Sequence, residues 1–259
     1  QPAADASVPG IVAFAREQDG ITATLRVTVA TEDDAELRLL RLCNRGASPR
    51  DLVITSYLEP VVGPGGADAA HPAFSKMFVQ TEWEPGRGAL LAMRRRRAAR
   101  DAQPWCAHFV GKPGGAPDAG TNEFESDRRR FLGRGRDLRR ALAFEPGAVL
   151  DGTTGCVLDP VLCLRRRITL APGAEVELAF WTAIAPTRDG VLALVDRLRE
   201  PGAPAATFEG AERAERALRD RLGTAADATH AHARLAAPLL SADARWRADA
   251  TALARGRGG

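Results

Sequence analysis

The sequence predicts a mostly β, antiparallel fold followed by helices, and three observations indicate it. Apolar and polar residues alternate with a period of two over residues 21–29, where Ile21, Leu25 and Val29 share one face. Similar short segments recur at spacings typical of a β-sandwich. After Thr187 the apolar period changes to 3.6, which is typical of helices.

The first expected strand pair is a hairpin. Asp19 and Gly20 suit the positive φ of a tight turn, so residues 11–15 are expected to pair with the strand that starts at Ile21. Further strands are expected at residues 36–43, 52–58, 76–81, 89–93 and 105–110. This spacing favours a sandwich over alternating strands and helices.

A second antiparallel hairpin is expected around the sequence APGA at residues 171–174. Pro172 and Gly173 suit the central positions of a type II turn, because Pro fixes its φ and Gly accepts a positive one. The flanking segments 162–170 and 176–180 both alternate in polarity. One face of this sheet is therefore expected to be exposed to solvent or to pack against polar groups.

Helices are expected in the last quarter of the chain. Four apolar residues share one helical face before Pro201: Val191, Leu194, Val195 and Leu198. From Ala205 onward Ala-rich and Arg-rich helices are expected, broken near Gly223 and Pro238, with residues 254–259 frayed or cut from a longer chain. Two segments rich in Gly, Pro and Ala, 60–73 and 112–122, are expected to be long loops.

Composition narrows the classes of function. In 259 residues, 36 basic side chains stand against 33 acidic ones, and a net charge of +3 does not favour nucleic acid as a partner. No apolar run approaches the roughly 20 residues of a membrane helix, and no leader is visible. We therefore expect the chain to be soluble. The four cysteines form no CxxC pair, so buried free thiols are expected, without a metal or cofactor.

Three ordered sequence blocks carry a resemblance to a known family. They are TSYLE at 55–59 with DAAHPAFSKMFVQTE at 68–82, FESDR at 124–128 with FLGRG at 131–135, and GTTG at 152–155 with LDP at 158–160. Together they resemble glycoside hydrolase family 94, formerly the glycosyltransferase family 36 type. Within that family, the sequence of the blocks most resembles that of the cyclic β-1,2-glucan synthases, and the resemblance covers about residues 8–199.

The resemblance implies a supersandwich of the galactose-mutarotase-like class over residues 1–187. Residues 188–259 would then be linker helices that lead toward a catalytic (α/α) barrel absent from this chain. The implied location is cytoplasmic, either as a separate protein or as the soluble part of an inner-membrane enzyme. The general acid and phosphate-binding residues of such enzymes belong to the barrel, so no catalytic residue is carried over. The sandwich is expected to lack strands at its N-terminus, which leaves edges for the helices after Ala205 or a second chain to cover; a homodimer is one such arrangement.

Sugar recognition is the expected role, with β-glucan or another oligosaccharide as the ligand. Trp181 and Trp105 are the preferred stacking candidates, ahead of Trp83 and Tyr57, because a pyranose presents an apolar face to an aromatic ring. Trp181 is opposite in phase to Phe180 and its apolar neighbours, which predicts that it faces away from the core. Burial in a core remains the alternative for each aromatic residue.

Polar candidates lie in two of the blocks. The expected sugar-binding side chains are Asn122, Glu125, Asp127, Arg128 and Arg134, with a solvated charge run as the alternative. The expected contact loop for glucan, barrel or partner contains Asp68, His71, Phe74 and Lys76. A metal site at His71, His108 and Asp68 matches no ligand spacing.

Other functions stay open as alternatives. An aldose epimerase would need His71 or His108 as an acid with Glu125 or Asp159 as a base. Glycoside hydrolysis by paired acids, Asp151 with Asp159 or Glu123 with Glu125, has no defined separation to support it. Anionic-surface or nucleic-acid binding would use the arginines at 94–97, 128–130 and 165–167. A purely structural dimerisation domain is a further alternative.

Overall fold

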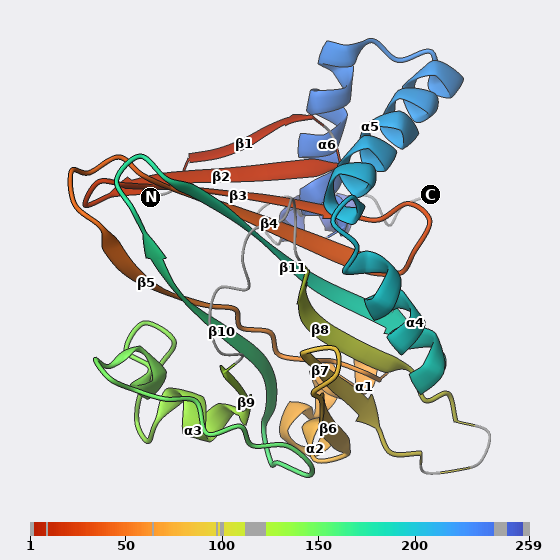
Figure 1. The fold of residues 1–259 in the computed structure, drawn as a ribbon. Coiled ribbons are helices and arrows are strands. Elements are labelled where there is room, and N and C mark those ends of the chain that lie inside the picture. Colours follow the sequence, from red (N-terminus) through yellow and green to blue (C-terminus); the bar gives the residue numbers. More distant parts are fainter. Residues whose placement is uncertain are drawn as a thin grey trace.

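The computed structural model describes residues 3–8, 10–63, 65–96, 98, 101–111, 123–240 and 248–255 (Figure 1). In these ranges the strands form two antiparallel sheets. The larger has the order β1-β2-β3-β4-β11-β8-β7-β6: β1 (Ala3–Val8), β2 (Ile11–Gln18), β3 (Ile21–Val29), β4 (Ala35–Asn44), β11 (Glu175–Ala185), β8 (Trp105–Gly111), β7 (Ala89–Arg94) and β6 (Val79–Glu84). The smaller has the order β5-β10-β9: β5 (Arg50–Thr55), β10 (Pro160–Leu170) and β9 (Glu123–Asp127).

Short helices interrupt the strands, and longer ones follow them. The helices are α1 (Gly65–Ala70), α2 (Pro72–Lys76), α3 (Arg128–Leu132), the 3-10 helix η1 (Leu142–Phe144), α4 (Arg188–Leu198), α5 (Ala203–Leu222), α6 (Ala226–Leu240) and α7 (Ala250–Arg255). A mostly β, antiparallel fold with C-terminal helices is therefore confirmed. None of the described helices is both long and apolar enough to cross a membrane.

Local sequence signals located several elements correctly. β2 and β3 pair as the expected hairpin, and Asp19 and Gly20 in its turn have φ of 51° and 76°. The strands expected at 36–43, 89–93 and 105–110 are β4, β7 and β8. Thr187 caps α4, since its hydroxyl accepts a hydrogen bond from the amide of Gly190 (3.1 Å). Turn and cap residues thus act through local geometry that the sequence displays.

The structure corrects the prediction that the segments on either side of Pro172 and Gly173 pair as a hairpin. The turn forms as expected, with φ of +72° at Gly173 and a hydrogen bond from the amide of Ala174 to the carbonyl of Ala171. However, β10 pairs with β5 and β9, whereas β11 pairs with β4 and β8. The turn therefore carries the chain from one sheet to the other, because each strand finds longer-range partners.

Several element bounds also differ from expectation. Lys76 ends α2, and β6 begins only at Val79; Leu58 makes an isolated bridge to Leu162 after β5 has ended. The loop expected at 60–73 contains α1 and the start of α2, and β1 and β9 were not predicted. α5 ends at Gly223 as expected, whereas α6 continues through Pro238 to Leu240. The loop expected at 112–122 lies outside the described residues.

The central strands of the larger sheet are covered on both faces, whereas most of β2 is exposed. Leu37, Phe109 and Trp181 on one face pack against α4 and α5, which contribute Val195 and Phe208. α5 crosses the face of β2, β3 and β4, where the guanidinium of Arg26 lies 3.9 Å from the ring centroid of Phe208. The helices thus form a layer on the sheet, as Figure 1 shows.

The opposite face of the larger sheet packs on the smaller one. Leu90 and Cys106 contact Leu162 and Leu164 of β10 in one cluster, and a second cluster forms around Leu42. The far side of β10 has its own core of Phe131, Leu150, Val161 and Cys163, among others. The segment from α3 to residue 150 supplies that cover. Cys43, Cys106 and Cys163 are buried free thiols as predicted, whereas Cys156 is exposed.

Candidate functional site

The three sequence blocks meet in one cluster of polar side chains, here called the Glu59 cluster: Tyr57, Glu59, Lys76, Arg128 and Asp159. Lys76 Nζ lies 2.8 Å from Glu59 Oε2 and 2.9 Å from Asp159 Oδ1. Arg128 reaches the same two acids, with Nε 3.1 Å from Glu59 Oε1 and Nη1 3.2 Å from Asp159 Oδ2. Two cations therefore bridge two carboxylates.

The residues of the Glu59 cluster are positioned by the smaller sheet and by the short helices next to it. Glu59 follows the Leu58–Leu162 bridge, and Lys76 is the last residue of α2. Asp159 precedes β10, and its carbonyl accepts a hydrogen bond from the amide of Arg128, the first residue of α3 (3.0 Å). Segments separated by up to about a hundred residues of sequence are thus fixed side by side by backbone bonds.

The cluster contains two cationic and two anionic side chains, and the contacts favour the charged forms of Glu59 and Lys76. Partial burial opposes ionisation, but hydrogen bonds from Lys76 and Tyr57 lower the pKa of Glu59 below its usual range. Partial burial likewise opposes the charge of Lys76, yet hydrogen bonds to Glu59 and Asp159 raise its pKa. Glu59 therefore cannot act as a general acid near neutral pH.

One side of the Glu59 cluster is open to solvent. The side chains of Glu59, Arg128 and Asp159 are about one-third exposed, and Lys76 is less so. Phe74 and Leu158, next to cluster residues in the chain, are exposed apolar side chains. Fixed donors and acceptors beside apolar surface can hydrogen-bond sugar hydroxyls while covering a C–H face.

The structure brings together only some of the predicted site residues. Arg128 and Lys76 belong to the Glu59 cluster, and Phe74 is exposed nearby on α2. Asp127 caps α3, where its Oδ1 accepts from the amide of Arg129 (2.8 Å). His71 is the exposed residue before α2. Asp68 lies half-buried in α1, Arg134 is exposed after α3, and Asn122 lies outside the described residues.

The structure contradicts the prediction that Trp181 faces away from the core and can stack on a sugar. Its phase is as predicted, opposite to Phe180, but the face to which it points is a second core and not an open surface. Trp181 is fully buried beneath α4 and stacks parallel to Phe109 at 6.4 Å between ring centroids. Trp105 is half-buried at the edge of the same core and faces Arg188. Neither ring is an open platform for a pyranose.

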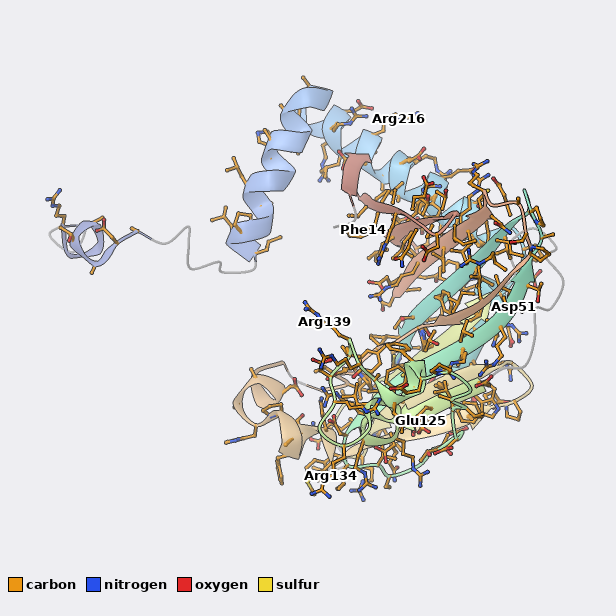
Figure 2. All side chains as sticks on the ribbon, turned by 90° about the vertical axis from the view of Figure 1, so that its left-hand side faces the viewer. Phe14, Asp51, Glu125, Arg134, Arg139 and Arg216 are labelled. Atoms are coloured by element: carbon orange, nitrogen blue, oxygen red, sulfur yellow. The ribbon has the colours of Figure 1, made fainter. Side chains whose placement is uncertain are left out.

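The structure also contradicts the prediction that Glu125 binds sugar. Its side chain is 1% exposed and lies inside the lower part of the body in Figure 2. Its Oε1 accepts hydrogen bonds from the amides of Ser126 and Asp127, both at 2.8 Å, and Oε2 accepts from the hydroxyl of Thr153. Burial raises the pKa of Glu125. This carboxyl group therefore fixes a backbone bend and is inaccessible to a ligand.

The predicted sugar-binding residues did not include Glu59 and Asp159 of the Glu59 cluster. Tyr57 was considered for stacking on a sugar ring, whereas in the structure it supports Glu59. Both acids stood inside the quoted blocks, so the sequence contained the signal but not the pairing. Tyr57 does not offer an open ring: it packs on Phe131 at 5.1 Å, and its hydroxyl donates to Glu59 (2.7 Å). Trp83 is likewise stacked on Phe124, at 4.1 Å.

Several alternatives are inconsistent with the geometry. His108 is enclosed between the sheets, and burial lowers its pKa to about 4, so it cannot serve as the acid of an epimerase at Glu125 or Asp159. Arg165 and Arg167 would both be exposed if this face of β10 were an open anionic-binding surface. Arg167 is exposed, but Arg165 is buried because the segment 128–150 covers it, and Arg166 on the opposite face of the strand is buried as well. Among the described residues no group of three or more His, Cys, Asp or Glu is arranged to hold a metal.

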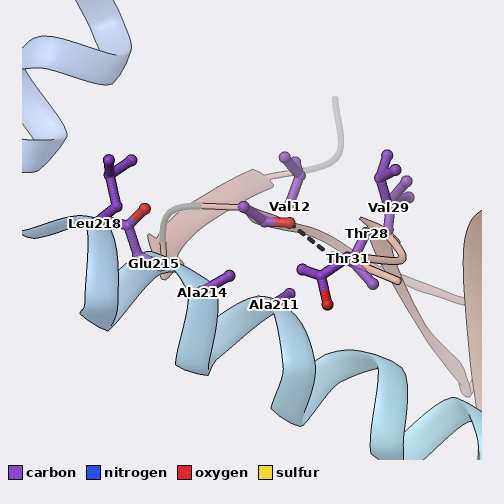
Figure 3. A pocket seen from close by; sticks show the side chains of 10 residues that line it. Val12, Thr28, Val29, Thr31, Ala211, Ala214, Glu215 and Leu218 are labelled. Carbon is purple, nitrogen blue, oxygen red and sulfur yellow. Dashed lines mark hydrogen bonds between the residues drawn. The ribbon is translucent and has the colours of Figure 1, made fainter. Parts of the chain in front are cut away.

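A separate groove of about 450 Å³ lies between α5 and the ends of β2 and β3 (Figure 3). Val12, Val29 and Leu218 are among its apolar lining residues, and Glu215 is the charged one among those described. The hydroxyl of Thr28 is already bonded to the carbonyl of Gly10 (2.8 Å). Such a lining offers few partners for sugar hydroxyls, so the Glu59 cluster is the better candidate.

Comparison with known proteins gives consistent matches. A family model described as the glycosyl hydrolase 94 supersandwich domain matches residues 8–201. The cyclic beta-(1,2)-glucan synthase NdvB of Rhizobium meliloti (strain 1021) is 42% identical over 188 residues, which are 73% of this chain and 7% of that protein. The chain therefore spans a small part of this relative.

Two solved structures are also similar. One is described as a kojibiose phosphorylase from the human microbiome: the match covers 80% of this chain and 23% of that one at 6% identity, with a TM-score of 0.43. The other is a polysaccharide lyase, matched over 68% of this chain and 22% of that one at 14% identity, with a TM-score of 0.38.

Proposed function

Because the chain belongs to the glycoside hydrolase 94 supersandwich domain family, as its sequence blocks predicted, we propose that it is a non-catalytic carbohydrate-binding and scaffolding domain. Its parent would be a cyclic β-1,2-glucan synthase or a related β-glucan phosphorylase. The ligand would be a β-glucan or oligosaccharide, held beside a separate catalytic barrel. No residue of this chain has a catalytic role in the proposal.

The Glu59 cluster is the observation that supports the binding role. Arg128 and Lys76 hold two carboxylates in fixed orientations, so little side-chain entropy would be lost when a sugar hydroxyl binds to them. Their charges cancel, which suits a neutral ligand better than an ionic one. Phe74 on α2 and Leu158, which precedes Asp159 in the chain, add exposed apolar side chains within the same sequence blocks.

The helices support the scaffolding role. The proposed division places the sandwich at residues 1–187 and the linker helices at 188–259, leading toward the barrel. α6 carries exposed leucines, Leu235, Leu239 and Leu240, of the kind that a neighbouring domain would cover. The proposed location is the cytoplasm, as part of an inner-membrane enzyme. A homodimer would be a further way to cover apolar surface.

Titration calorimetry with linear and cyclic β-1,2-glucans tests the binding role, with cello-oligosaccharides as the comparison ligand. Arg128→Gln should abolish the heat of binding, because it removes two hydrogen bonds that orient Glu59 and Asp159. Arg130→Gln is the matched control, since half-exposed Arg130 pairs with Asp151 (2.8 Å) and Asp127 (4.0 Å), which lie outside the Glu59 cluster. Wild-type binding should be nearly independent of salt.

The outcomes separate binding from scaffolding. Absence of heat with every glucan in the wild-type chain would contradict the carbohydrate-binding role and leave a scaffold. Equal loss in both variants would indicate that surface charge and not the Glu59 cluster is responsible. Thermal unfolding of each variant provides the check that the fold is retained.

A further inference from the structure

One segment of the surface carries an unusual concentration of positive charge. Residues 128–140, here called the arginine loop, contain seven arginines and a single acidic residue, Asp137, for a net charge of +6. The whole chain has a net charge of only +3, so the remainder is net negative. The positive potential of the protein is thus concentrated on one loop beside the smaller sheet.

Four of these arginines are available to a partner. Arg128 belongs to the Glu59 cluster, whereas Arg130 pairs with Asp151 and Arg136 with Glu145. The others are exposed and have no carboxylate within 4.0 Å among the described residues: Arg129, Arg134, Arg139 and Arg140.

Asp137 does not neutralise the free arginines. Its Oδ1 accepts hydrogen bonds from the backbone amides of Arg139 (2.9 Å) and Arg140 (3.1 Å). The carboxylate therefore fixes the turn that presents these two residues. In Figure 2 Arg139 lies at the upper edge and Arg134 at the lower edge of the lower part of the body.

Exposed apolar side chains accompany the free arginines. Leu138 is 44% exposed, Leu142 46% and Phe144 54%, whereas Ala141 and Ala143 between them are buried in the core beneath. The backbone is thus anchored through small residues, while the large apolar side chains stay about half exposed and the ring of Phe144 meets the edge of buried Phe131 at 5.6 Å between ring centroids. Basic residues interleaved with exposed leucine and phenylalanine are typical of surfaces that bind at the interface of an anionic bilayer.

We propose that the arginine loop, with Leu138, Leu142 and Phe144, binds the surface of an anionic lipid bilayer. Lipid headgroups provide a dense layer of phosphates for the four unpaired guanidinium groups, and the apolar side chains enter the boundary of the acyl chains. Arginine suits this role because its planar fork forms paired hydrogen bonds with phosphate. This contact would orient the domain. Its four unpaired arginines lie outside the Glu59 cluster, and Arg128 is the one residue that the cluster and the arginine loop share.

Vesicle flotation with the full chain tests the proposal. The vesicles are phosphatidylcholine alone, or phosphatidylcholine and phosphatidylglycerol in equal parts. Binding is expected only to the anionic vesicles and should weaken as salt is added. The triple variant Arg134→Gln, Arg139→Gln, Arg140→Gln should bind on the order of 100-fold more weakly, because each arginine near an anionic surface contributes a factor of about five.

Two further variants make the test specific. Arg213→Gln, Arg216→Gln, Arg221→Gln removes the same charge from exposed positions on α5 and should bind anionic vesicles nearly as the wild type does. Phe144→Ser with Leu138→Ser keeps the charge and should reduce binding at high salt more than at low salt. Circular dichroism establishes that each variant is folded.

The proposal is overturned if the wild-type chain does not bind anionic vesicles. It is equally overturned if the triple variant on α5 loses as much binding as the triple variant in the arginine loop. It is also overturned if both vesicle types bind equally, since charge would then have no part. Retention of a mixed-sequence single-stranded nucleic acid by the arginine loop, without vesicle binding, would assign the surface to a different polyanion.

Discussion

The hydroxyl of Ser56 lies 2.8 Å from Nε2 of His108, which joins the segment after β5 to β8 of the larger sheet. The other ring nitrogen, Nδ1, lies 3.2 Å from the hydroxyl of Thr182 on β11. His108 is only 3% exposed, and burial lowers its pKa to about 4. A neutral imidazole is therefore part of the contact between the two sheets.

The free energy of unfolding should fall in mild acid because of His108. The unfolded residue takes up a proton below its ordinary pKa of 6.5, whereas the folded one stays neutral down to about 4. The unfolded state therefore binds more protons in this window, and stability present above pH 6.5 is lost as the pH falls. Between pH 7 and pH 5 the loss through this residue should be about 2 kcal/mol.

Urea unfolding at the two pH values measures this loss. In His108→Gln the pH dependence over this window should be smaller by that amount, whereas in His71→Gln, a change at an exposed residue, it should be retained. Equal pH dependence in the wild type and His108→Gln would contradict the prediction.

Trp181 should be required for stability. Trp181→Ala removes a fully buried ring between Phe109 and α4 and should lower the free energy of unfolding by about 3–5 kcal/mol. Trp105→Ala should cost less, because that ring is only partly buried. Urea unfolding followed by circular dichroism gives both values, and similar small losses would indicate that the second core is not formed.

Arg165 and Arg167 provide a matched pair on β10. Arg165 is 1% exposed and donates to the carbonyls of Ala143 (2.5 Å) and Ala148 (2.8 Å), so its truncation leaves buried acceptors and Glu123 short of a donor. Arg165→Ala should cost about 3–5 kcal/mol, a penalty typical of a broken buried pair. Arg167→Ala should cost about 1 kcal/mol or less, because Arg167 is exposed. Chemical unfolding separates the two values, and comparable costs would argue against burial of Arg165.

Thiol labelling should distinguish Cys156 from the other cysteines. Cys156 is exposed, whereas burial raises the pKa of Cys106 to about 12 and also raises that of Cys163. In the native chain a thiol-specific reagent should therefore modify one cysteine rapidly, and all four only in denaturant. Rapid native labelling that persists in Cys156→Ser would show that a second thiol is accessible.

The alternation of residues 21–29, the turn at Asp19 and Gly20, and the change of apolar period after Thr187 identified elements whose cause is local. The turn at Pro172 and Gly173 was also correct, but its neighbours β10 and β11 do not pair. Two amphipathic strands beside a turn are equally compatible with a hairpin and with a passage between sheets. Only partners distant in sequence, β5 and β4, decide between them.

By itself the sequence determined the family, the mostly β fold and the positions of most strands, because periodicity, turn chemistry and ordered motifs are local properties of the chain. Only the tertiary structure decided which faces are covered. α4 buries Trp181, the segment 128–150 buries Arg165, and the blocks around Glu59, Lys76 and Asp159 meet in one cluster. Burial and ion pairing depend on residues far apart in the chain, so the phase of a single strand cannot reveal them.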